Sequence, residues 1–336
     1  MSSVRDPQKS REGRPAPAEV ARDRGRGAGD IGGPAQRRGR RRADRALPYV
    51  LLVPSVIAIV GLLAYPLVTL LRMSFQQLGL AELIQRKTVW VGFDNYATII
   101  SDRFFWLVTA RTIVFAFVSA GLTMAIGTLI ALLMRRLGRG MRLLVSIGML
   151  LAWATPVASA AVLYRWLFDS EFGVVNQLIT LLTPWDFTSH AWFFDSWSAW
   201  AVILLLVVWQ AVPFVALTVY AGLTSIPSEI YEAAKIDGAG AWRQFWGVTA
   251  PMIRPVLLIL LTLSLIWDLK VFTQVYILTK GGPNKGTTVL NIYTYQEGFG
   301  VSRFGVAAAA AVVMVAITLA VTVWYVRNML RLGEEL

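Results

Sequence analysis

The stretch EIYEAAKIDGAGAWRQFWGVTAPMIRP, residues 229–255, is a polar interruption between two long apolar stretches of this 336-residue chain. Pro227 suits the first turn of a helix, because the N–H that proline lacks would have no partner there. Gly238 and Gly240 can adopt the left-handed backbone that ends a helix and turns the chain. A second helix should then carry a stripe at the spacing of one helical face, formed by Trp242, Phe245, Trp246 and Thr249. The sequence therefore predicts a short helix–turn–helix.

The composition around this interruption is that of a membrane protein. The chain is 56% hydrophobic and only 15% charged, with 13 Trp and 16 Phe, whereas soluble domains are about a quarter charged. A helix needs about 20 mostly apolar residues to cross a bilayer. Stretches of that kind occur at 49–71, 107–134, 143–167, 199–223, 256–278 and 304–330. The predicted fold class is all-α, a polytopic membrane protein with six transmembrane helices and a cytoplasmic helix–turn–helix.

The distribution of basic residues predicts the orientation of these spans. Segment 1–46 is basic and has few large apolar residues, so it should be a disordered tail, while 47–336 should form the transmembrane domain. Arginines also gather in RRLGRGMR, residues 135–142, and near the C-terminus. Because basic loops stay on the cytoplasmic side, we expect both termini and the polar interruption to lie there. Nucleic-acid binding or a twin-arginine export signal would be other uses for such a tail, but arginines beside a span favour membrane anchoring.

A resemblance emerges from the spacing inside the interruption. Glu232, Ala233 and Ala234, then Gly238, then Pro251 resemble the Glu-Ala-Ala loop of type I ABC importer permeases. Val248 and Ala250 stand where the family has Ile and Leu. Further segments, among them YRWLFDSEFGVVNQ and KVFTQVYILTKGGPNKGTTVLNIYTYQEGF, resemble the permeases for maltose, trehalose and glycerol-3-phosphate. The resemblance covers about residues 48–330.

The resemblance implies a function and a set of partners. The core unit would span about 105–330, and the loop, about 225–254, would couple the chain to an ATPase through Glu232, Ala233, Ala234, Asp237, Gly238, Trp242, Phe245 and Pro251. The implied partners are a second homologous permease, two cytosolic ATPase subunits that carry ATP and Mg, and an extracellular or periplasmic substrate-binding protein. The chain would lie in a bacterial inner or plasma membrane. On physical grounds alone, an amphipathic hairpin on the lipid headgroups remains an alternative.

Several kinds of chemistry have no basis in the sequence. There is no Cys and a single histidine, His190, so thiol chemistry and His-rich metal sites are excluded. No Gly-Lys dipeptide occurs, and a phosphate-binding loop requires one. The glycine-rich KGGPNKGTT at 280–288 has the wrong order for such a loop and indicates turns instead. We therefore predict a transport subunit that is not an enzyme, binds no metal or cofactor, and uses ATP hydrolysis performed by its partners.

The solute pathway is predicted from polar and aromatic residues within the spans. Asp268 and Lys270 lie in the fifth span, where ionisable groups mark functional sites by default. Proteins usually bind sugars through aromatic rings, on which the sugar stacks, together with hydrogen-bonding side chains. The predicted pathway residues are Trp209, Gln210, Trp267, Asp268, Lys270, Gln274 and Tyr276, with Trp153 and Phe272 as further candidates.

The predicted function is that of a permease subunit in an ATP-driven sugar importer. The link LTKGGPNKGTTVL favours carbohydrates, because it resembles the sugar permeases. Importers for another small polar solute share the Glu-Ala-Ala loop and remain an alternative. An ion-coupled secondary transporter would require several buried carboxylates and repeated spans. The spans contain one central carboxylate, Asp268, and no obvious repeat.

Overall fold

The computed structural model describes residues 34–334, with side chains described from 51 to 327. These residues divide into two units at residue 62, and all packing described below lies in the second unit. The elements in chain order are α1 (Pro34–Ser74), β1 (Gln76–Gln77), α2 (Leu80–Gln85), β2 (Val89–Trp90), α3 (Asp94–Ser101), α4 (Arg103–Arg136), α5 (Arg139–Ala154), α6 (Val157–Leu167), α7 (Val174–Leu182), α8 (Ser196–Thr224), α9 (Ser228–Ile236), α10 (Ala241–Gln244), α11 (Ala250–Met252), α12 (Arg254–Leu269), α13 (Thr273–Thr279), α14 (Leu290–Tyr295) and α15 (Phe304–Glu334). Two turns are π-helical. The first, η1 (Phe245–Thr249), joins α10 to α11, and the second, η2 (Gln296–Gly300), follows α14.

The predicted all-α fold class is confirmed, with one small addition. The strands β1 and β2 form a two-residue antiparallel pair in which Gln76 lies opposite Trp90. The Asn95 amide of α3 donates to the carbonyls of Ser74 and Gln76, both at 2.9 Å, and so holds this pair in place. α1 begins at Pro34 and thus includes part of the predicted tail, while residues 1–33 lie outside the described residues.

Four helices in the described part are long and apolar enough to cross a membrane: Leu51–Ser74 within α1, then α4, α8, and Phe304–Arg327 within α15. Two bent helix pairs bring the number to six if each pair is counted as one span. One pair is α5 with α6, bent by 98°, and the other is Ala241–Met252 with α12, bent by 77°. The described residues thus contain four to six candidate spans, and the predicted six are reached only if both bent pairs are counted as spans.

The structure corrects the predicted spans 143–167 and 256–278, because each is broken. α5 ends at Ala154 and α6 begins at Val157, with Pro156 between them; proline disfavours a helical conformation for the residue before it. α12 ends at Leu269 and α13 begins at Thr273. At this second break the Asn291 amide donates to the carbonyl of Val271 at 3.2 Å, which satisfies a group that the lost helical bonds leave free.

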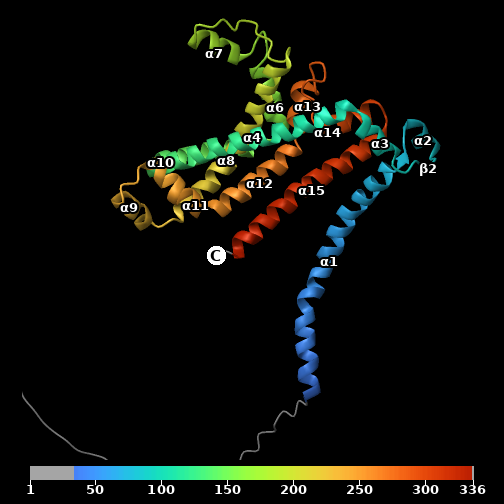
Figure 1. The fold of residues 1–336 in the computed structure, drawn as a ribbon, viewed down its shortest axis with the longest axis horizontal. Helices are drawn as coiled ribbons and strands as arrows, with labels where there is room; N and C mark the ends of the chain where they lie inside the picture. The colour runs from blue at the N-terminus through green and yellow to red at the C-terminus, as the bar shows by residue number, and fades with distance from the viewer. Residues whose placement is uncertain (1–33, 335–336) are drawn as a thin grey trace, which may run out of the picture. The chain divides into compact units, whose positions relative to one another are not determined.

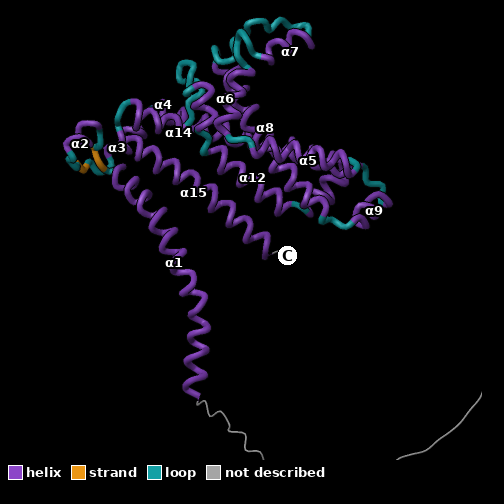
Figure 2. Tube along the Cα trace, turned by 180° about the vertical axis from the view of Figure 1, so that it is seen from behind, coloured by secondary structure: helices purple, strands orange, loops and turns teal. Residues whose placement is uncertain are grey.

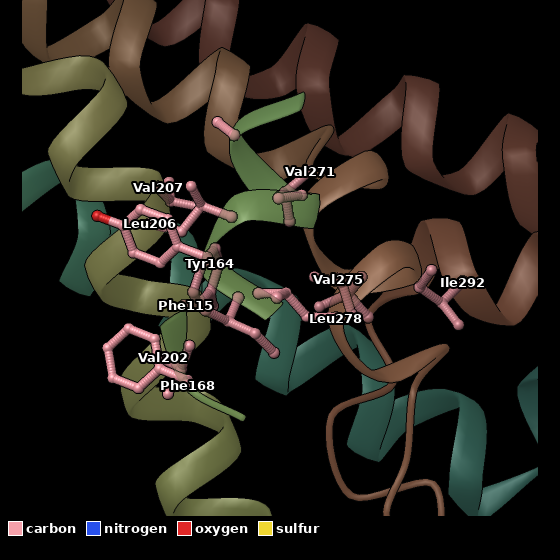
Figure 3. Close-up of a cluster of buried hydrophobic side chains, with 14 residues drawn as sticks. Phe115, Tyr164, Phe168, Val202, Leu206, Val207, Val271, Val275, Leu278 and Ile292 are labelled. Carbon is pink, nitrogen blue, oxygen red and sulfur yellow. The ribbon is translucent and has the colours of Figure 1, made fainter. Parts of the chain in front are cut away.

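The long helices pack side by side in the second unit (Figure 1 and Figure 2). α4 packs against α8 and α12, and α12 packs against α15. A buried apolar cluster joins α4, α6, α8 and α13 through Phe115, Tyr164, Leu206 and Val275 (Figure 3). Many large apolar side chains on the same helices are exposed instead. An exposed apolar exterior around a packed interior is what a protein surrounded by lipid requires.

The predicted loop at 280–288 is confirmed, and its contacts hold α13 near α4 and α8. The hydroxyls of Thr279 and Thr287 lie 2.8 Å apart. The Trp200 indole of α8 donates to the Gly286 carbonyl at 3.1 Å, and the Arg111 guanidinium of α4 donates to the Lys285 carbonyl at 3.0 Å. These contacts link the loop to α4 and α8 and so hold α13 beside them.

The start of α8 is set by a capping carboxylate. Asp195 accepts hydrogen bonds from the Ser198 hydroxyl and from the Trp197 N–H. These hydrogen bonds hold the pKa of the Asp195 carboxyl below its ordinary value. An ionised carboxylate at this position also suits the positive end of the helix dipole.

The crossing of α4 and α8 depends on Gly127, and its replacement by alanine should destabilise the protein. A Cβ at this position would lie 2.6 Å from Val215 Cγ1 and 3.2 Å from the backbone nitrogen of Ala216. Overpacking of this kind costs about 1–3 kcal/mol, so Gly127→Ala should lower the midpoint of thermal unfolding in detergent. Gly121→Ala is the matched control on the same helix, because nothing lies within 4 Å of its Cβ. Equal midpoints for the two variants would contradict the close crossing.

Candidate functional site

Segment 225–254 lies at the end of the bundle where α4 and α15 also end (Figure 1). Tyr231 of α9 is buried, and its hydroxyl lies 3.3 Å from that of Thr249. The Arg135 guanidinium of α4 lies 4.2 Å from the centroid of the Tyr231 ring. Tyr231 therefore fixes α9 to α4 on one side and to η1 on the other.

The turn between the two short helices forms where the glycine predicts it. Gly238 has a φ of +73°, a conformation that glycine adopts without strain. The N–H of Gly238 donates to the Lys235 carbonyl at 3.0 Å, and that of Ala239 donates to the Ala234 carbonyl at 2.9 Å. These bonds satisfy the last carbonyls of α9, which is how a glycine-terminated helix usually ends.

The second helix differs from the prediction, because residues 245–249 form a π-helical turn. Trp242 and Trp246 are exposed and lie 5.7 Å apart between ring centroids, whereas Phe245 is half-buried and Thr249 is buried. The predicted aromatic stripe is thus divided between an exposed pair and an inward-facing pair.

The exposed surface of segment 225–254 combines acidic, small and large apolar side chains. Glu232, Ala233, Asp237, Gly238 and Pro251 are exposed, and Ala234 is half-buried. Trp242 is 77% exposed and Ile236, which the sequence did not single out, is 87% exposed. The one ion pair among the described residues joins Arg303 to Glu297, so Glu232 and Asp237 have no basic partner there. Exposed apolar and aromatic area of this kind is typical of a surface that binds another protein.

A cavity of about 420 Å³ lies where both broken spans are interrupted. Thr155 and Pro156 line it at the bend between α5 and α6, and Val271 lines it at the break after α12. Its other lining residues are Trp153, Val157, Val207, Gln210, Ala211, Ser264, Trp267, Asp268 and Gln274. Irregular backbone at membrane depth is tolerated where it borders a cavity, so the two breaks and this cavity belong together.

The polar groups of this cavity are only partly satisfied within the chain. Asp268 is 5% exposed, and its Oδ2 accepts a hydrogen bond of 2.6 Å from the Ser119 hydroxyl of α4. The Gln210 amide donates to the Thr155 carbonyl at 3.1 Å, while its Oε1 is buried without a partner in the described part of the chain. An unpaired buried acceptor raises the free energy of the folded state.

The structure places the predicted pathway residues in different environments. Gln210, Trp267, Asp268 and Gln274 line the cavity. Trp209 packs against Tyr164, Tyr276 packs against Phe272 and Tyr295, and Lys270 is exposed outside the lining. Ser119, Thr155 and Ser264 were missed, because small hydroxyl residues are common in membrane helices and carry no signal of their own.

A larger cavity of about 650 Å³ lies between α4 and α8 near the loop 280–288. Its lining is mainly apolar, with Leu107, Val114, Phe115 and Leu204 among its members. It offers few partners to a polar solute, so we assign the candidate pathway to the smaller cavity. The described residues contain no cluster of His, Cys, Asp and Glu that could hold a metal ion.

Comparisons with known proteins agree on one kind of relative. A family model described as a binding-protein-dependent transport system inner membrane component matches residues 123–331. The diacetylchitobiose uptake system permease protein DasB of Streptomyces coelicolor is 44% identical, over 95% of this chain and 96% of its own length. The trehalose/maltose transport system permease protein MalF of Thermococcus litoralis is 32% identical, over 71% of this chain and 79% of its own.

A solved structure supports the same fold. A crystal structure of a bacterial ABC transporter involved in the import of the acidic polysaccharide alginate contains a chain that matches with a TM-score of 0.74. The match covers 88% of this chain and 99% of that chain at 23% sequence identity. At this identity the likeness concerns the fold alone.

Proposed function

The chain belongs to the family of binding-protein-dependent transport system inner membrane components, and we propose that the solute it carries is a carbohydrate. Membership makes it a multi-pass permease subunit of an ABC importer in the inner membrane. Permease subunits of this family perform no catalysis and bind no cofactor, because ATP is bound by separate ATPase subunits.

The observation that carries the carbohydrate proposal is the 44% identity, over 95% of the chain, to a permease named for diacetylchitobiose uptake. The smaller cavity supports it in chemical terms. Trp153 and Trp267 offer indole faces, and Asp268, Gln210 and Gln274 offer hydrogen-bonding groups. Apolar faces with a few placed polar groups are the usual composition of a small-molecule site. We propose that the solute passes through this cavity.

The proposed coupling surface is segment 225–254. Its exposed Glu232, Ala233, Asp237 and Trp242 would contact an ATPase subunit, with Gly238 setting the turn. The small side chains allow close approach, and the carboxylates would pair with basic groups of the partner. This requires the segment to face the cytoplasm, which the arginines of residues 135–142 favour, because they lie at the same end of the bundle.

The remaining partners follow from the mode of transport. We propose a second homologous permease, because six spans of a single chain do not enclose an alternating-access route by themselves. Two ATPase subunits and a substrate-binding protein would complete the complex, the latter being named in the description of the family. The division into a tail at 1–46 and a permease domain at 47–336 stays a prediction.

The proposal is tested by reconstituting the complete complex in proteoliposomes. Each candidate solute is presented on its binding protein, chosen beforehand by a thermal-shift screen of that binding protein against sugars. We expect ATP-dependent uptake of a disaccharide and no uptake of amino acids or polyamines. Uptake of an amino acid with no uptake of any sugar would contradict the carbohydrate assignment and leave the family membership intact.

A further inference from the structure

A third cavity, of about 580 Å³, lies between the last turns of α4 and segment 225–254. Three basic residues line it: Arg135 and Arg136 from α4, and Lys235 from α9. No acidic residue is among its lining residues. The cavity is therefore a concentration of positive charge at one end of the bundle, and neither the solute pathway nor the exposed coupling surface explains it.

None of these three cations forms an ion pair with a carboxylate in the described part of the chain. The one ion pair there, between Arg303 and Glu297, lies elsewhere. The end of α4 is capped by a different residue, Arg142, which donates to the carbonyls of Met134 at 3.1 Å and Leu137 at 2.7 Å. All three residues are exposed, and like charges that line one cavity without a counterion repel one another, which an anion bound among them would offset.

One of the cations is already held in position. The Arg135 guanidinium lies 4.2 Å from the ring centroid of Tyr231, which is itself buried and hydrogen-bonded through Thr249. A cation stacked on a fixed aromatic ring keeps its N–H donors free for an anion. Because the Arg135 side chain is already ordered, less side-chain entropy is lost when it binds an anion than for a mobile surface arginine.

The other half of the cavity is apolar and leads to the exterior of the bundle. Leu129, Leu132 and Leu133 line it on α4, one to two turns before the arginines. Leu129 is 66% exposed and Leu133 is 55% exposed. At about 1.5 Å per residue, Leu129 and Arg135 are about 9 Å apart along the helix. This distance lies within the roughly 5–10 Å by which apolar side chains of interfacial helices enter the boundary between headgroups and acyl chains.

We propose that this cavity binds an anionic phospholipid. The headgroup phosphate lies between Arg135, Arg136 and Lys235, and an acyl chain runs along Leu129 and Leu133. Basic pockets between membrane helices bind lipid headgroups in this manner. The bound lipid contacts α4 and α9 at once, so the lipid composition of the leaflet acts on the position of segment 225–254.

Lipid retention by the purified permease–ATPase complex, measured by native mass spectrometry with added phosphatidylglycerol or phosphatidylcholine, tests this proposal. Phosphatidylglycerol should be retained in preference to phosphatidylcholine. The triple variant Arg135→Gln, Arg136→Gln, Lys235→Gln should lose phosphatidylglycerol by on the order of a hundredfold, because each basic residue near the surface contributes roughly fivefold. The matched control removes three exposed cations outside the cavity, by Arg139→Gln, Arg243→Gln and Arg254→Gln.

Each alternative occupant gives a different result. Equal loss in the control variant would show general surface attraction and would overturn the site. Full displacement of the lipid by inorganic phosphate would show a free-anion site instead. If the triple variant retains phosphatidylglycerol but no longer copurifies with the ATPase, the cavity is a protein contact. The single variant Arg136→Gln, with an expected loss of roughly fivefold, keeps the test decisive if the triple variant does not fold.

Discussion

ATP-driven uptake should fall by roughly thirtyfold or more when Glu232 is replaced by alanine. In the proposed complex Glu232 would be buried against a basic group of the ATPase, and truncating one partner of such a buried charge pair costs about 2–5 kcal/mol. Glu232 is exposed on α9 and has no ion pair within the described residues. Its removal should therefore leave the folding and membrane insertion of the permease unchanged. Uptake into proteoliposomes and copurification with the ATPase subunits are the two measurements.

The matched control is Glu229→Ala, which removes the other exposed glutamate of the same helix. It changes the net charge equally, and Glu229 is not among the predicted coupling residues, so its effect should be much smaller. A complex of full transport activity obtained from Glu232→Ala would refute the coupling role of this residue. Equal losses from both variants would show that only the charge of α9 matters.

The second large effect is expected at the cavity. Asp268→Ala should reduce uptake by about five- to a hundredfold, because leaving a buried hydrogen-bonding group of the solute without its partner costs about 1–3 kcal/mol. A carboxylate within a span is costly to retain unless it binds something, and Ser119 supplies only one hydrogen bond, to Oδ2. The apparent affinity for the solute-loaded binding protein, measured in the same vesicles, should change far less than the uptake rate.

The control for this variant is Thr262→Val on the same helix. Thr262 is buried like Asp268, but its hydroxyl donates within α12, to the Leu258 carbonyl at 2.9 Å. Ser119→Ala should lie between the two, since it leaves the carboxylate in place. Should Thr262→Val impair uptake as strongly as Asp268→Ala, the loss would reflect packing of α12 rather than solute contact.

The sequence predicted the helical class and the turn at Gly238, because each depends on local composition, and its six spans correspond to the upper limit of the four to six candidates. It did not predict where spans break. Pro213 lies inside α8 without interrupting it, whereas Pro156 separates α5 from α6 by a bend of 98°. The same residue type interrupts one helix and not the other, since packing around each proline decides whether neighbouring groups can satisfy the freed backbone.

Only some of the residues that line the smaller cavity could be predicted, because their position depends on how the helices pack. Gln210 and Trp209 are adjacent in the sequence, and only the rotation of α8 shows that Gln210 lines the cavity while Trp209 packs against Tyr164. The partner of Asp268 could not be predicted either, because Ser119 is 149 residues away. Contacts of that range depend on the arrangement of helices, which residue periodicity does not specify.

The π-helical turn at 245–249 has a consequence for the direction in which segment 225–254 presents its tryptophans. A π turn holds one more residue than an α turn, and an α-helix rotates by about 100° per residue. If the same residues formed an uninterrupted α-helix, Trp242 would be rotated by about 100° about the axis of the helix Ala241–Met252, which is itself bent by 77° from α12. The one extra residue taken up by the π turn thus sets the direction in which the helix Ala241–Met252 presents the exposed indole ring of Trp242.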